Sequence, residues 1–347
     1  MSITSVPIGL PEVIAGAIIV ALTGYALTGG ADFGGGVWDL LASGPRRDEQ
    51  RRLIADAIGP IWEANHVWLI VAVVVLFTGF PAAFGALATI LHIPLTLVLL
   101  GIVLRGSAFV FRSYRRTGRA VAERWGLVFS IASVITPFFL GVVVGAISSD
   151  AVGRAASLPV DAPFAERYVE PWFAPYPIAV GCFAVALFAM LAAVYSAHAA
   201  RDAALQEDFR RRALVSAVVV AVAAATSLLV SKLAAPRVAT GITTSPWAAL
   251  LQVCTAVAAL TAIAALATRR YRAARVAAAA QVSLILLGWA LAQYPFVVPP
   301  SWSIRQSAAP METLELLLIG LVVGALVLIP SLRLLFRTFS RVDPSGP

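Results

Sequence analysis

Long apolar runs separated by short polar stretches make up most of the sequence. Nine runs are long enough for membrane-spanning helices, each of which needs about 20 mainly apolar residues. They cover residues 8–28, 54–80, 84–104, 125–147, 172–197, 213–230, 247–267, 276–292 and 313–336. Because the runs are continuous, they lack the alternating pattern of a membrane β-barrel. The pattern predicts an all-α polytopic membrane protein with about nine transmembrane helices.

Polar connections divide these runs into groups. Residues 148–171 form the longest connection expected outside the membrane, and they separate the first four runs from the next four. We therefore predict a first four-helix bundle (1–147), an outward loop (148–171), a second four-helix bundle (172–300), and a ninth transmembrane helix with its tail (301–347). The first bundle holds nearly all ionisable groups inside the runs, whereas Ala, Val and Leu dominate the second, as in close helix packing.

Composition and charge agree with this class. Of the 347 residues, 60% are hydrophobic and only 13% are charged, which excludes an ordinary soluble domain. The net charge of +8 does not indicate nucleic-acid binding, because the 26 Lys and Arg residues segregate: twenty fall on the side of the C-terminus, five on the other side, and Arg105 at a run end. The basic side is expected to be cytoplasmic, with the N-terminus outside and the first run retained. Cys182 and Cys254 lack metal-type spacing, so no metal site is predicted.

The second run contains an unusual polar group within "GPIWEANHVWLI" (59–70). Asp56 and Glu63 are seven residues apart and His66 follows three later, so one continuous helix would place them on one face. Pro60 would weaken that helix just below Glu63. Buried ionisable groups are costly and commonly form proton relays. We expect a proton-carrying stripe rising from the cytoplasmic edge, or, alternatively, hydrogen bonds that only orient the helices.

A glycine-rich segment, "TGGADFGGGVWDLL", follows the first run. Its glycines permit close approach of another backbone, a side chain or a cofactor. Asp32 is expected at the inner mouth of the bundle, level with Arg105, which either pairs with it or extends to the interface. Asp39 is expected to face the solvated headgroup region. A phosphate loop is disfavoured, since no strand precedes the segment and no Lys follows.

His92 raises a further alternative. By helical rise it would lie about 12 Å inside the outer edge of its run, and His66 about 18 Å above the inner edge of the preceding one. In a core about 30 Å thick these depths are similar. A bis-histidine haem b bundle is therefore weighed as an alternative function.

Four segments occur in the order found in a known family: "GADFGGGVWDLL", "IGPIWEANHVWLI", "LHIPLTLVLLGIVLRGSAFVFR" and "QYPFVVPPS". The chain resembles subunit II of the cytochrome bd-type quinol oxidases, including their cyanide-insensitive branch, most densely over residues 24–114. The resemblance implies a subunit of the prokaryotic cytoplasmic membrane that pairs with a haem-bearing subunit I. It places haem b and haem d in that partner and none here, and leaves open a structural quinone and a small accessory subunit.

The resemblance also assigns residues. Glu63 matches the acidic position of the second segment, Asp32 that of the glycine-rich segment, and Arg105 the arginine closing the third run. Packing near the pathway or the partner haem is implied for Trp62, Asn65 and Trp68.

Two departures from the family change this picture. Thr28 stands where some members have a second acid, and His66 where some have Gln, so His66 is expected to supply protonation capacity. We predict a non-haem subunit that supports assembly and proton delivery while the complex couples quinol oxidation to reduction of oxygen to water. The proton pathway candidates are Glu63, Asp32, His66, Arg105 and Asp56. A proton-coupled secondary transporter is the main alternative.

Overall fold

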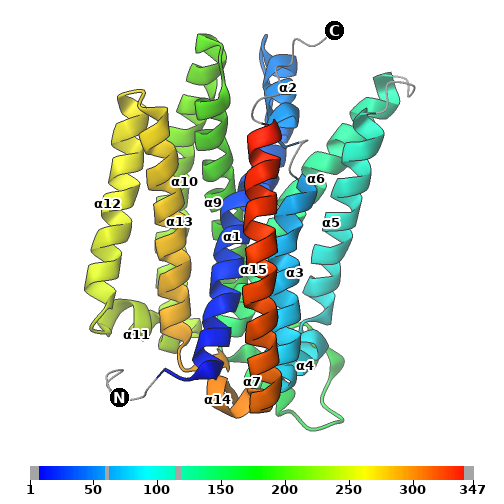
Figure 1. The fold of residues 1–347 in the computed structure, drawn as a ribbon, viewed down its shortest axis with the longest axis vertical. Coiled ribbons are helices and arrows are strands. Elements are labelled where there is room, and N and C mark those ends of the chain that lie inside the picture. The colour runs from blue at the N-terminus through cyan, green and yellow to red at the C-terminus, as the bar shows by residue number, and fades with distance from the viewer. Residues whose placement is uncertain (1–7, 59–61, 114–118, 340–347) are drawn as a thin grey trace.

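The computed structural model describes residues 8–58, 62–113 and 119–339. Long helices run side by side along one axis (Figure 1). They are α1 (Leu10–Leu40), α3 (Trp62–Gly79), α5 (His92–Ser113), α6 (Arg119–Ser148), α9 (Pro175–Ala199), α10 (Ala203–Ala234), α12 (Ala248–Ala267), α13 (Tyr271–Gln293) and α15 (Met311–Phe339).

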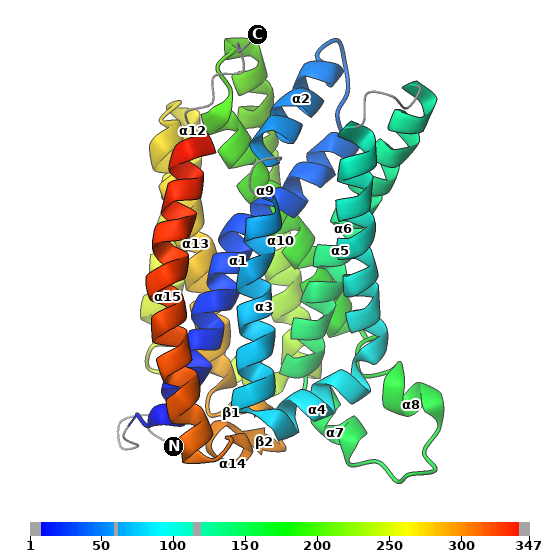
Figure 2. The same ribbon diagram turned by 45° about the vertical axis from the view of Figure 1, so that its right-hand side comes forward.

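Shorter elements cover the two ends of this bundle (Figures 1 and 2). They are α2 (Arg47–Ile58), α4 (Pro81–Ile90), α7 (Ala151–Ala156), α8 (Phe164–Tyr168), α11 (Pro236–Thr244), α14 (Ile304–Ser307), and an antiparallel pair of strands, β1 (Phe296–Val298) and β2 (Trp302–Ser303). We call the end with α2 the α2 end, and the end with α4, α7, α11 and α14 the α4 end.

In the described part of the chain, eight helices are long and apolar enough to cross a membrane. The number reaches nine if α3 and α4, bent by 117° at their junction, are counted as one broken span. The prediction of an all-α membrane protein with about nine transmembrane helices is confirmed.

One of the predicted runs is misplaced. The run at 54–80 covers the end of α2, described to Ile58, and α3, described from Trp62, with residues 59–61 outside the described residues. The run at 84–104 is shifted, because the chain bends after Gly79, α4 lies across the bundle end, and α5 begins only at His92. Prolines account for the shift: Pro81 starts α4 and Pro94 lies in the first turn of α5, where a missing N–H costs nothing.

Helix α1 lies at the centre of the molecule and crosses it obliquely (Figure 2). It packs against α3, α6, α9 and α13, and α9 packs in turn against α6 and α10. A Cβ on Gly34 would collide with the backbone carbonyl of Phe188 on α9, and one on Gly36 with the side chain of Ser133 on α6. The glycine-rich segment is the last part of α1, which ends at Leu40. Its glycines let α9 and α6 pack directly against the backbone of α1.

The α4 end is closed by apolar side chains. Helix α4, the bend before it, α7 and the strand pair share one buried cluster. It includes Phe80, Leu87, Ile90, Leu91, Val152, Val298 and Ile304. These residues form a floor beneath α1 and α3, which we call the apolar floor.

Candidate functional site

A buried ion pair joins α1 to α5. The guanidinium of Arg105 donates to the carboxylate of Asp32, and both side chains are buried. The Nε of Arg105 also donates to Ser133 Oγ on α6, at 3.0 Å. Of the two interpretations of Arg105, pairing with Asp32 is the one found. Asp32 Oδ2 has no hydrogen-bond partner among the described residues, so this pair keeps one acceptor free.

Two aromatic rings enclose the guanidinium of Arg105. Its Cζ lies 4.9 Å from the ring centroid of Phe33 and 4.9 Å from that of Phe129. Such contacts attract a cation electrostatically, and more strongly where water is excluded. The cation is thereby stabilised by one carboxylate, one hydroxyl and two ring faces.

His66 also packs near Phe33, the ring that Arg105 contacts. Its ring centroid is 6.1 Å from that of Phe33 and 5.9 Å from that of Tyr25. The Tyr25 hydroxyl and His66 Nδ1 are 3.5 Å apart, at the outer limit of a hydrogen bond. The structure thus brings three predicted residues, Asp32, Arg105 and His66, into one site and adds Tyr25 to it.

Two other residues of the "WEANHVW" segment, Asn65 and Trp68, pack inside the molecule. Asn65 is buried, and its amide nitrogen has no acceptor among the described residues. Trp68 packs closely on Gly24 of α1, where a Cβ would lie 2.8 Å from its ring. The side chains of Trp62 and Glu63 lie outside the described residues, as does Pro60, so their roles stay predictions.

Asp56 lies outside the buried site. It is exposed on α2, and residues 59–61, which connect α2 to α3, lie outside the described residues. That Asp56, Glu63 and His66 share one face of one helix therefore stays a prediction. The charged sequence of α2, "RDEQRRLIADAI", explains the exposure of Asp56, because such a helix is stable at the bundle end and not within the membrane.

A second ion pair lies seven residues further along α1, about 10 Å toward the α2 end. Asp39 is buried; Arg112 lies 3.0 Å from its Oδ1, and Ser130 Oγ donates to Oδ2 at 2.8 Å. Arg51 on α2 adds a longer ion pair at 3.8 Å. The expectation of a solvated Asp39 is wrong, because α1 extends to Leu40 and α2 folds back over it.

The spacing in the sequence contained a signal for this arrangement. Asp32 and Asp39 are seven residues apart on α1, and Arg105 and Arg112 are seven apart on α5. Both helices run toward the α2 end, so equal spacing brings two pairs into register. We call Asp32 with Arg105 the inner pair and Asp39 with Arg112 the outer pair. The sequence predicted only the inner pair, as one of two alternatives for Arg105. It did not predict the serines of α6 that hydrogen-bond to each pair.

Polar contacts also fix the chain between α1 and α2. Arg46 donates to both carboxylate oxygens of Asp208 on α10, at 2.8 and 2.6 Å. This hydrogen-bonded pairing raises the pKa of the Arg46 guanidinium above its ordinary value. Gln50 donates to Asp208 and accepts from Arg212. The connection is therefore held against α10 beside the outer ion pair.

His92 lies far from this site. It starts α5, is exposed, and packs its ring on Tyr168, with centroids 5.2 Å apart. His66 is thirteen residues, or about 20 Å along α3, from the bend at Gly79 that precedes the α4 end. The expected similar depth of His66 and His92 is wrong, and with it the geometry of a bis-histidine haem.

Comparison with known proteins agrees with the resemblance. The family model described as cytochrome bd terminal oxidase subunit II matches residues 10–339. Cytochrome bd ubiquinol oxidase subunit 2 of Bacillus subtilis is 33% identical over 126 residues, 36% of each chain. Cytochrome bd-I ubiquinol oxidase subunit 2 of Escherichia coli is 33% identical over 127 residues, 36% of this chain and 32% of the relative. These alignments span about a third of the length of the curated relatives.

A solved structure extends the similarity in fold. The bd oxidase from Geobacillus thermodenitrificans contains a chain that superposes with a TM-score of 0.73 at 21% identity. The superposition covers 95% of this chain and 98% of that one. The two chains share a fold over nearly their whole length.

Proposed function

Because the chain belongs to the cytochrome bd terminal oxidase subunit II family, we propose that it is the non-haem subunit of a membrane-bound quinol oxidase. A haem-bearing partner subunit, with haem b and haem d, oxidises the quinol and reduces oxygen to water. The names of the relatives specify ubiquinol and, in a putative second Bacillus subtilis enzyme, menaquinol, which supports a quinol as the reductant. This chain supports assembly and conducts protons from the cytoplasm toward the partner's haems.

One observation carries the proton role: two buried ion pairs lie in register between the α2 end and His66. The positive-inside rule assigns the arginine-rich α2 end to the cytoplasm, so the Asp39–Arg112 pair comes first and the Asp32–Arg105 pair second. Intramembrane ionisable groups that face the bundle interior mark proton and ion paths. The free Oδ2 of Asp32 can accept a proton from a neighbouring water.

Each residue then has a part in this path. Asp32 is the proposed gate behind Asp39, because Arg105 holds one carboxylate oxygen in place and the other, Oδ2, has no partner among the described residues. His66 receives protons beyond Phe33, with Tyr25 oriented toward its Nδ1. Glu63, one turn before His66 in α3, is the proposed buried carrier next to the partner.

The proton role is tested by D32N in the assembled oxidase, measured as quinol-dependent oxygen consumption. We expect turnover to fall by roughly tenfold or more, since a proton-transfer group typically contributes at least this much. The haem absorbance per mole of purified complex should stay at the wild-type value, because Asn can still accept from Arg105. D161N, in the exposed loop before α8, is the matched control and should leave turnover unchanged. Wild-type turnover in D32N overturns the proton role.

The partner is tested separately. The chain is captured from native membranes in mild detergent and the visible absorption spectrum of the eluate is recorded. A Soret band that follows a second membrane chain supports the oxidase assignment. A haem-free eluate with no second chain favours a proton-coupled transporter instead.

A further inference from the structure

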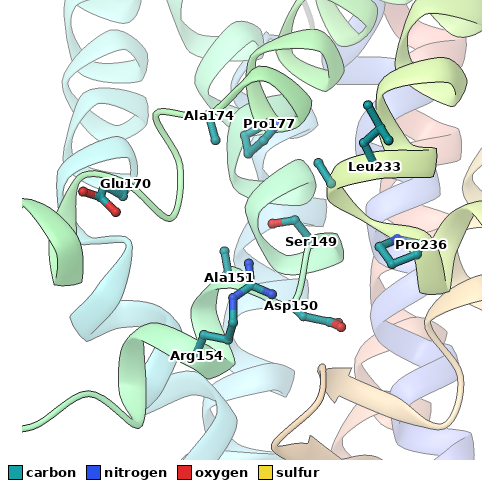
Figure 3. Close-up of a pocket in the computed structure, with 10 residues that line it drawn as sticks. Ser149, Asp150, Ala151, Arg154, Glu170, Ala174, Pro177, Leu233 and Pro236 are labelled. Atoms are coloured by element: carbon teal, nitrogen blue, oxygen red, sulfur yellow. The ribbon is translucent and has the colours of Figure 1, made fainter.

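A cavity of about 390 Å³ opens at the α4 end, away from the ion pairs and His66. Its walls come from the α6–α7 corner, the α8–α9 connection and the α10–α11 corner (Figure 3). The volume falls within the range of about 300–1,000 Å³ found for small-molecule sites. The proton path does not use this cavity, so its chemistry needs a separate explanation.

Charged side chains of both signs line the cavity. The guanidinium of Arg154 points toward its centre (Figure 3), and no described residue accepts a hydrogen bond from it. Glu170 also lines the cavity, at the left of Figure 3 and on the other side of Arg154 from Asp150, and it forms no ion pair with any described residue. Asp150 also lines the cavity, but it forms an ion pair with Arg237, at 3.4 Å. The cavity thus offers one cation, Arg154, and one acid, Glu170, that form no ion pair among the described residues.

An apolar track leads away from the cavity along α10. Leu233 lines the cavity, and 91% of its surface is exposed. Other strongly exposed residues follow at helical spacing on the same face: Leu229, Val222, Val218 and Val215. In a bilayer this track lies at the depth of the acyl chains, directly continuous with the charged cavity.

We propose that the cavity binds an amine-headgroup phospholipid, of the phosphatidylethanolamine class, from the leaflet at the α4 end. The phosphate pairs with Arg154, since guanidinium donors match phosphate oxygens. The ammonium group pairs with Glu170, and one acyl chain lies along Leu233 and the track on α10. An anionic lipid without an amine would leave Glu170 unpaired beside a phosphate. A free phosphate would make no use of the track.

The test uses the full chain, with whatever subunits co-purify, transferred into mild detergent and studied by native mass spectrometry. It is titrated in parallel with dioleoyl phosphatidylethanolamine, dioleoyl phosphatidylglycerol and inorganic phosphate. The wild type should retain phosphatidylethanolamine in preference to the other two. R154A should lower its retention by roughly tenfold, as expected for one lost charge-assisted contact. E170Q should remove the preference for phosphatidylethanolamine over phosphatidylglycerol.

Matched controls lie outside the cavity. R272A, at the start of α13, and E166Q, on α8, remove the same charges from exposed positions and should leave retention unchanged. R154K keeps a point charge and should lie between wild type and R154A. Equal retention by wild type and R154A overturns the site. Equal binding of the two lipids overturns the amine assignment, and phosphate binding as tight as that of the lipid overturns the lipid assignment. None of these results depends on oxidase activity.

Discussion

The two ion pairs between α1 and α5 have the same chemistry and spacing, but their arginine side chains differ in exposure to solvent. The inner arginine, Arg105, exposes 2% of its side chain, whereas the outer one, Arg112, exposes 23%. The inner pair is enclosed by two aromatic rings, those of Phe33 and Phe129. The outer carboxylate, Asp39, is shared with a second arginine from α2. The repeated spacing therefore produces an outer pair that reaches the surface at the α2 end and an inner pair that is buried.

Replacing Arg105 should produce the largest effect. In R105A the carboxylate of Asp32 stays buried without its cation, and removing one partner of a buried pair costs about 3–5 kcal/mol. Chemical unfolding of the purified complex in mixed micelles measures this loss. In the double variant D32N/R105A part of the stability should return, because no buried charge remains. If R105A lowers the free energy of unfolding less than R112A does, burial does not make the inner pair the stronger contributor.

The close approach of α9 gives the next largest effect. In G34A the new methyl group meets the backbone carbonyl of Phe188, so α9 must move away from α1, the helix that carries Asp32. Overpacking of this kind costs about 1–3 kcal/mol. G16A on the same helix is the control, since nothing lies within 4 Å of its new Cβ. Equal stability of the two variants would show that α1 and α9 separate without cost.

Replacing Arg112 should cost less and should respond to salt. Asp39 keeps Ser130 and Arg51 in R112A, so we expect a loss of about 1–2 kcal/mol. Since part of this pair reaches the surface, its contribution should shrink as ionic strength rises, whereas that of Arg105 should not. Unfolding of both variants between low and high salt provides the measurement. Identical salt responses would remove the distinction between the two pairs.

Removing the hydroxyl of Tyr25 should have the smallest effect on stability. Its distance of 3.5 Å from His66 makes a weak contact, so Y25F should change the unfolding free energy by at most about 1 kcal/mol. If Tyr25 orients His66 for proton transfer, turnover should fall with the complex still intact. Stability and oxygen consumption are measured on the same preparation, and a large stability loss with normal turnover would make Tyr25 structural.

Hydropathy alone predicted the class of fold, because every helix that crosses a membrane core needs a long apolar run. It could not place the bend at Gly79, since "FTGFPAAFG" is apolar on both sides and only the geometry around Pro81 separates two helices. Asp32 and Arg105 could be matched by depth. Asp39 was misplaced because its burial depends on α2 folding back, a tertiary contact that local pattern does not encode.

The apolar floor at the α4 end has an electrical consequence. Below His66, α3 runs thirteen residues to the bend without an ionisable side chain, and α4 then covers the end of the bundle with buried apolar groups. A path that is polar at one end and dry at the other is a half-channel. If protons enter from the α2 end, as proposed, they can return or pass sideways into a neighbouring protein, but the apolar floor gives them no route across the bilayer. Under that proposal, the bend at Gly79 and the floor keep proton delivery from discharging the membrane voltage.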